Sequence, residues 1–165
     1  MASFDQHINQ ARKNFIVLEG INKSVTDSWD WQVTTAFYAA VHLVNAHLAQ
    51  KANLHYRTHK DVKISLYSSM SPAKIPEEIY LAYAKLEMLS RRARYLCSDQ
   101  EKPNPGDESK AFLTFDKHLR KALIHLDKLM NYIASAYSLS FPKIYLDCAE
   151  LKGITLTYFI YAKTA

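Results

Sequence analysis

The residues best suited to bind an anion lie in the fourth predicted helix, where arginine and hydroxyl side chains recur every three or four positions. This spacing gives one flank of the helix five polar residues: Tyr83, Glu87, Ser90, Arg91 and Arg94. Two guanidinium groups and a hydroxyl suit bidentate phosphate binding, and a tyrosine ring can stack on a nucleobase. The alternative is an ion pair of Arg91 or Arg94 with Glu87, which leaves a solvated flank without a ligand.

Two more residues extend this predicted anion site at the start of the third predicted helix. Thr58 is followed three residues later by Asp61, which is typical of a capped helix start. Arg57 and His59 flank this cap, and the amino end of a helix favours anions. We therefore add Arg57 and His59 to the anion site.

We expect no metal site in this chain. His55 and His59 are four residues apart, but the cap at Thr58 places His55 in a connector, so the two imidazoles do not share a helix face. No glutamate follows the first of them as in a zinc protease motif. A third histidine, His42, is predicted to join Tyr38 and Asn45 in a buried polar cluster, as a hydrogen-bonded core or interface residue rather than a catalyst.

Apolar residues at helical spacing predict five helices that must position these side chains. The five helices are expected at residues 4–19, 29–50, 58–70, 76–96 and 112–133. Gly20 is expected to end the first of them in the left-handed conformation. The second helix is apolar on two sides, which is typical of a helix in the middle of a bundle. Its second face, lined by Ala39, His42, Ala46 and Ala49, predicts a homodimer if one chain does not cover it.

The last segment has a different pattern. Ile154, Leu156, Tyr158 and Ile160 alternate along the chain, which favours a strand. A hairpin turning near residues 151–153 and a short helix capped by Gly153 are both consistent with the residues before it. We divide the chain into a helical bundle at 1–140 and a C-terminal extension at 141–165.

The composition agrees with an all-α up-and-down bundle of about five helices. A chain of 165 residues, 48% hydrophobic, is enough for one core, and three glycines with five prolines are too few for many short strands. Two cysteines, no secretory signal and no long apolar run favour a cytoplasmic protein that does not cross a membrane. The net charge of +5 permits nucleic-acid binding without requiring it.

Several segments together resemble the HEPN domains of prokaryotes. They are FYAAVHLVNAHLA, RTHKDV, SRRARY and a long last helix after a polar loop, and the resemblance covers roughly residues 29–135. The resemblance implies a dimerising bundle of four to five helices. It also implies either a metal-independent endoribonuclease with an Arg and a His separated by four to six residues, or a non-catalytic binding partner, often beside a nucleotidyltransferase.

Arg120 and His125 match the spacing of the catalytic pair in that family. The resemblance then implies that His125 acts as general acid or base and that Arg120 stabilises the charged phosphorane, with the RNA 2′-hydroxyl attacking. The family commonly has Asn or Asp after the arginine, where this chain has Lys121. Five residues of regular helix also turn by about 140°, so a bend or a dimer partner is needed to unite the pair.

We therefore predict a binding or assembly module that recognises a nucleotide, an RNA or a partner protein. The expected partners are a second copy of the chain and a nucleotidyltransferase or an antitoxin, and no cofactor is expected. The alternative is a metal-independent ribonuclease toxin.

Overall fold

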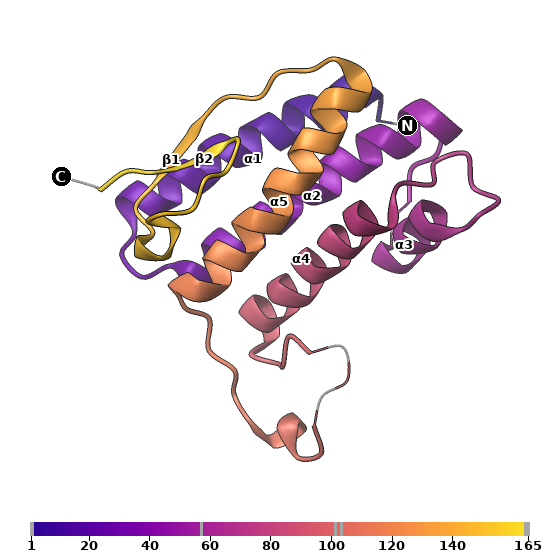
Figure 1. The fold of residues 1–165 in the computed structure, drawn as a ribbon. Helices are drawn as coiled ribbons and strands as arrows, with labels where there is room; N and C mark the ends of the chain where they lie inside the picture. Colours follow the sequence, from indigo (N-terminus) through magenta and orange to yellow (C-terminus); the bar gives the residue numbers. More distant parts are fainter. Residues whose placement is uncertain (1, 57, 101, 103, 164–165) are drawn as a thin grey trace.

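Four long helices form the bundle, and a small extension covers one of its sides (Figure 1). The computed structural model describes residues 2–56, 58–100, 102 and 104–163. In these residues the long helices are α1 (Phe4–Ser24), α2 (Trp29–Ala52), α4 (Glu77–Tyr95) and α5 (Asp116–Tyr137). The short helix α3 (His59–Tyr67) packs on α4, and a long loop containing η1 (Asp107–Ser109) joins α4 to α5. The predicted all-α bundle is confirmed.

The first four helices start within one residue of their predicted starts, but the predicted start of the last helix at residue 112 is wrong, because Phe115 is still extended and α5 begins at Asp116. Thr58 caps α3 by accepting a hydrogen bond from the Asp61 amide, as expected. The predicted end of α1 at Gly20 is wrong, because the helix continues to Ser24 and the chain reverses later, at Asp27 with its φ of 55°. Helix α3 ends at Tyr67, three residues before its predicted end, since the ψ of Ser68, 129°, is no longer helical.

Helix α2 lies at the centre of the bundle and contacts α1, α4 and α5. Ala39 and Ala46, from its predicted second face, are fully buried within this chain. That face therefore does not require a second copy, and the homodimer stays a prediction. Within the described residues, no helix combines the length and apolar character needed to cross a membrane.

The C-terminal extension contains two short strands, β1 (Ile144–Leu146) and β2 (Phe159–Tyr161), joined through η2 (Ala149–Leu151). The strands pair in parallel, with Ile144 opposite Phe159. A hairpin turning near residues 151–153 is therefore not formed, because a hairpin would make them antiparallel. The connection runs past the end of the pair and returns, so both strands point the same way.

Side chains of the bundle hold the extension by binding its backbone. The Asn22 side chain accepts a hydrogen bond from the Asp147 amide at 2.7 Å and donates to the Asp147 carbonyl at 3.3 Å. On α5, the buried Asp127 carboxylate accepts the amides of Thr157 and Tyr158 at 3.1 and 2.7 Å. Each side chain thus makes hydrogen bonds to the backbone of the extension that a neighbouring strand would otherwise make.

We expect Asp127→Ala to destabilise the protein, because it leaves the amides of Thr157 and Tyr158 without their acceptor. A lost acceptor of this kind costs about 1–3 kcal/mol of unfolding free energy, measurable by urea denaturation. The control is Glu108→Ala, which removes an exposed carboxylate in the α4–α5 loop. Equal stability of the two variants would contradict the anchoring role of Asp127.

Candidate anion-binding site

The structure brings part of the predicted anion site together where α3 meets α4. The His59 ring lies against Phe37, with 5.0 Å between ring centroids, and its Nδ1 is 3.5 Å from the Tyr83 hydroxyl. Burial lowers the pKa of His59; Glu87 opposes this effect, while Arg94 and Lys63 lower the pKa further. His59 is therefore an uncharged ring at neutral pH, close to two cations and one carboxylate.

Two predicted members of the site are inaccessible. Tyr83 and Ser90 are fully buried, so the stacking and hydroxyl contacts predicted for them cannot reach a ligand in this structure. Burial also raises the pKa of Tyr83, and Glu87 adds to this effect, so its hydroxyl stays protonated. Arg91 is exposed on α4, whereas Arg57 lies outside the described residues.

The predicted alternative, an ion pair of Arg91 or Arg94 with Glu87, is wrong, because Glu87 pairs with a different residue. Glu87 pairs with Lys63 of α3, with 2.8 Å between carboxylate oxygen and ammonium nitrogen. Arg94 instead donates from Nε to the Ser90 carbonyl, and its guanidinium lies over the Tyr95 ring. One flank of α4 is therefore used partly to hold α3, and Arg94 is left beside His59.

The candidate catalytic residues Arg120 and His125 have different neighbours on α5. The Arg120 guanidinium lies 3.7 Å from Glu150, in η2 of the C-terminal extension. Burial lowers the pKa of His125, as do the charges of Lys128, Lys85 and Lys121. Arg120 thus faces the extension, whereas His125 lies close to Lys85 of α4, as the helical rotation predicted.

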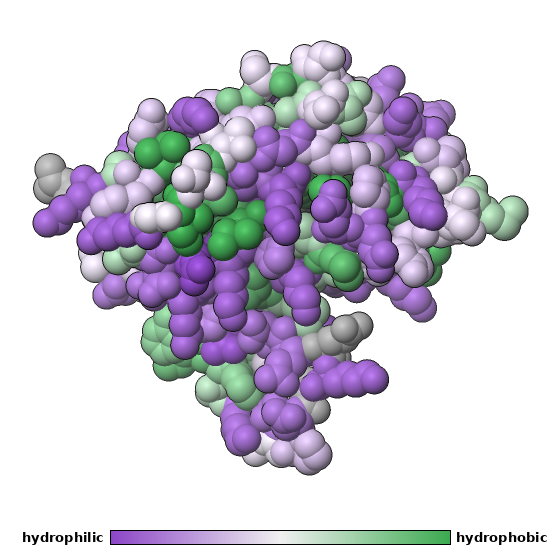
Figure 2. Space-filling view, in the orientation of Figure 1, coloured by the Kyte–Doolittle hydropathy of each residue, from purple (hydrophilic) through white to green (hydrophobic). Residues whose placement is uncertain are grey.

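These three exposed lysines lie close enough to His125 for their charges to act on it, and they form what we call the lysine surface. Lys121 lies four residues before His125, and Lys128 lies three residues after it. One face of α5 therefore carries the side chains of Lys121, His125 and Lys128. Lys85 joins them from α4. Figure 2 shows hydrophilic side chains over the face that α4 and α5 form. The α5 spacing is visible in the sequence, but Lys85 is brought in only by packing.

The structure also contains a histidine cluster that the sequence did not predict. His7 of α1 contacts His42 of α2 and His55 of the following connector, with ring nitrogens 3.1 and 3.2 Å apart. The predicted cluster of His42 with Tyr38 and Asn45 is not formed, and Asn45 donates to the Val41 carbonyl instead. In the part of the chain that the structure describes, no group of three or more His, Cys, Asp or Glu is arranged to hold a metal ion.

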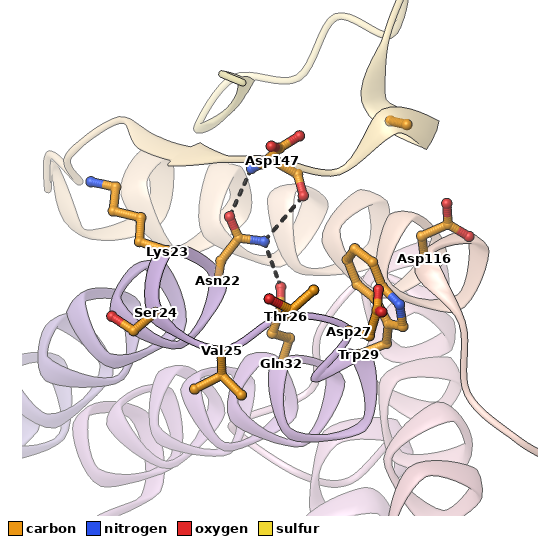
Figure 3. Close-up of a pocket in the computed structure, with 11 residues that line it drawn as sticks. Asn22, Lys23, Ser24, Val25, Thr26, Asp27, Trp29, Gln32, Asp116 and Asp147 are labelled. Carbon is orange, nitrogen blue, oxygen red and sulfur yellow. Dashed lines mark hydrogen bonds between the residues drawn. The ribbon is translucent and has the colours of Figure 1, made fainter. Parts of the chain in front are cut away.

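A separate pocket of about 400 Å³ lies between the α1–α2 turn and the C-terminal extension (Figure 3). Asp27, Asp116 and Asp147 line it together with the Trp29 ring. Asn22 spans one side of it through its hydrogen bonds to Gln32 and Asp147. Its carboxylates repel anions, so this pocket does not extend the anion site.

Comparisons with family models, curated proteins and solved structures found no match for this chain. The resemblance to HEPN domains therefore depends on the sequence segments within residues 29–135 alone.

We expect two charge-removing variants to move the pKa of His59 in opposite directions. Glu87→Gln removes the charge that raises this pKa and lowers it further, whereas Arg94→Gln raises it. An NMR titration of the imidazole protons measures both shifts, and the His125 resonance serves as the internal control. An unchanged His59 pKa in both variants would show that these residues are not neighbours in solution.

Proposed function

We propose that this protein is a HEPN-like binding module that recognises the phosphates of an RNA or nucleotide through its lysine surface. The observation that carries the proposal is the set of three exposed lysines around His125, contributed by two helices. The charged groups that act on the pKa of His125 are these three lysines, and all of them are cations. Such a surface attracts phosphates more strongly than scattered lysines do.

The chemistry of the surface suits a polyanion rather than one small ligand. The lysines are exposed on the two helices, so they can contact successive phosphates and release counterions from them. The uncharged His125 ring supplies a hydrogen-bonding group at the centre. Arg94 and His59 form a weaker second contact point, because the carboxylate of Glu87 lies beside them.

The proposed partners are a second copy of the chain and a nucleotidyltransferase or antitoxin. Helix α2 has no Asp, Glu, Lys or Arg between Asp30 and Lys51, and it leaves Trp31 64% and Tyr38 42% exposed. An exposed, uncharged aromatic strip is typical of a protein interface. This strip supports the proposed assembly role.

We expect the double variant Lys121→Glu/Lys128→Glu to weaken binding of single-stranded RNA by at least about tenfold at low salt, since both phosphate contacts become repulsive. The slope of log affinity against log salt falls by about one for each lysine lost. Fluorescence anisotropy with a labelled oligonucleotide measures both quantities.

The matched control is Lys13→Glu/Lys74→Glu, which reverses the same number of exposed charges on other parts of the surface. It should weaken binding far less. Equal losses in the two double variants, or no binding by the wild type, would contradict the lysine surface as the binding site.

A metal-independent ribonuclease is the second candidate, and one observation favours it. In the described residues, Nε of Arg120 and Nδ1 of His125 are buried without a hydrogen-bond partner. Unpaired buried nitrogens are rare in proteins, and a catalytic role is one explanation for them. Because the two side chains have different neighbours within one chain, a shared site requires the arginine of a second copy.

For this candidate we expect cleavage of single-stranded RNA in excess EDTA. His125→Ala removes the proton-transfer group and should lower the rate by about 10² to 10⁴, and Arg120→Ala, which removes the stabilising guanidinium, should lower it as well. Gel analysis of a labelled RNA measures the rate. A wild type that binds RNA without cleaving it excludes the ribonuclease and leaves the binding module.

A further inference from the structure

Three imidazoles from separate parts of the chain meet beside the start of α1. His7 comes from the second turn of α1 and is buried, with 4% of its surface exposed. His42 lies in the middle of α2, and His55 follows the end of α2 at Asn53. The His7 ring stacks on His55 with an angle of 19° between ring planes, and its two nitrogens point to different neighbours.

This arrangement suits uncharged rings. Each neutral imidazole has one N–H donor and one acceptor, so three neutral rings can supply both hydrogen bonds of the cluster. One added proton on His7 is also compatible with both bonds, but it places a charge on a buried ring. A second proton places two cations about 3 Å apart and opposes two N–H donors.

Among the described residues, no carboxylate acts on the pKa of His7 or His42 to compensate for added protons. Besides burial, the groups that lower the pKa of His7 are His42 and His55, and its value falls to about 4. Burial and His55 lower the pKa of His42 as well. The other side chains that line the adjoining pocket are uncharged: Ala2, Gln6 and Gln10.

We propose that the histidine cluster is a pH-sensitive latch that joins the start of α1 and the connector after α2 to the bundle at neutral pH and releases them on mild acidification. The sign follows from proton linkage. An unperturbed imidazole binds a proton near pH 6.5, whereas the pKa of His7 in the closed cluster is lowered to about 4. Opening therefore takes up protons, and it becomes more favourable as the pH falls through this interval.

Release of the connector would also change the position of the beginning of α3. His55 precedes His59 by only four residues, and His59 contacts Tyr83 and neighbours Arg94 on α4. The latch thus links protonation at the α1–α2 side to the placement of His59 beside Arg94 and Lys63 at the α3–α4 side. This coupling does not depend on which ligand binds the lysine surface.

A shared metal ion is the competing explanation for three adjacent histidines. His7 offers Nδ1 to His42 and Nε2 to His55, so the nitrogens in contact do not converge on one point. Within the described residues, no group of three such side chains is arranged to hold a metal. The geometry therefore favours proton binding.

Hydrogen exchange of the full-length protein tests the latch between pH 7.5 and pH 4.5. After correction for the intrinsic pH dependence of exchange, protection of residues 4–10 and 53–56 should fall on acidification by up to about 100-fold per pH unit, the limit for uptake of two protons. Residues 86–93 of α4, which contain no histidine, provide the internal reference and should change much less. Equal pH dependence in all these segments would overturn the proposal.

Two variants test which residues cause the effect. His55→Asn changes an exposed side chain and should reduce the local pH dependence, and His7→Phe, which fills the buried site, should reduce it further. His125→Gln, on α5, should leave it unchanged. An unaltered response in His55→Asn, or tight binding of one Zn²⁺ at pH 7.5 by the wild type, would overturn the latch.

Discussion

The fold depends on the burial of α2. Its central twenty residues contain no Asp, Glu, Lys or Arg, so the helix cannot be stable with its sides in water and must be covered by α1, α4 and α5. Its alanines let these neighbours approach closely. The remaining helices need only one apolar stripe each, and their other sides are free to carry the charged residues that give the surface its chemistry.

The helical bundle could be predicted because its apolar residues keep one period over each long helix. Local rules failed where a distant contact decides the structure. Gly20 stays helical, and α1 continues to Ser24, which places Asn22 in the helix with its side chain hydrogen-bonded to Asp147 of the extension. The two strands pair in parallel, a relation that alternation within one segment cannot reveal.

The candidate site was predictable only in part for the same reason. Helical spacing placed Tyr83, Ser90 and Arg94 near one another, but it could not show that the first two point into the core. Lys121 and Lys128 could be grouped with His125 from spacing, whereas Lys85 belongs to another helix. The histidine cluster combines residues 7, 42 and 55, which no sequence motif connects.

The hydrogen-bonded pair of Asn22 and Asp147 has a consequence for the order of folding. Its partners are 125 residues apart in the chain, so the bond closes a very long loop. The entropy of closing such a loop is lost in a single step unless the intervening helices have already docked. We therefore expect the extension to join a preassembled bundle, which makes it the last part of the protein to fold.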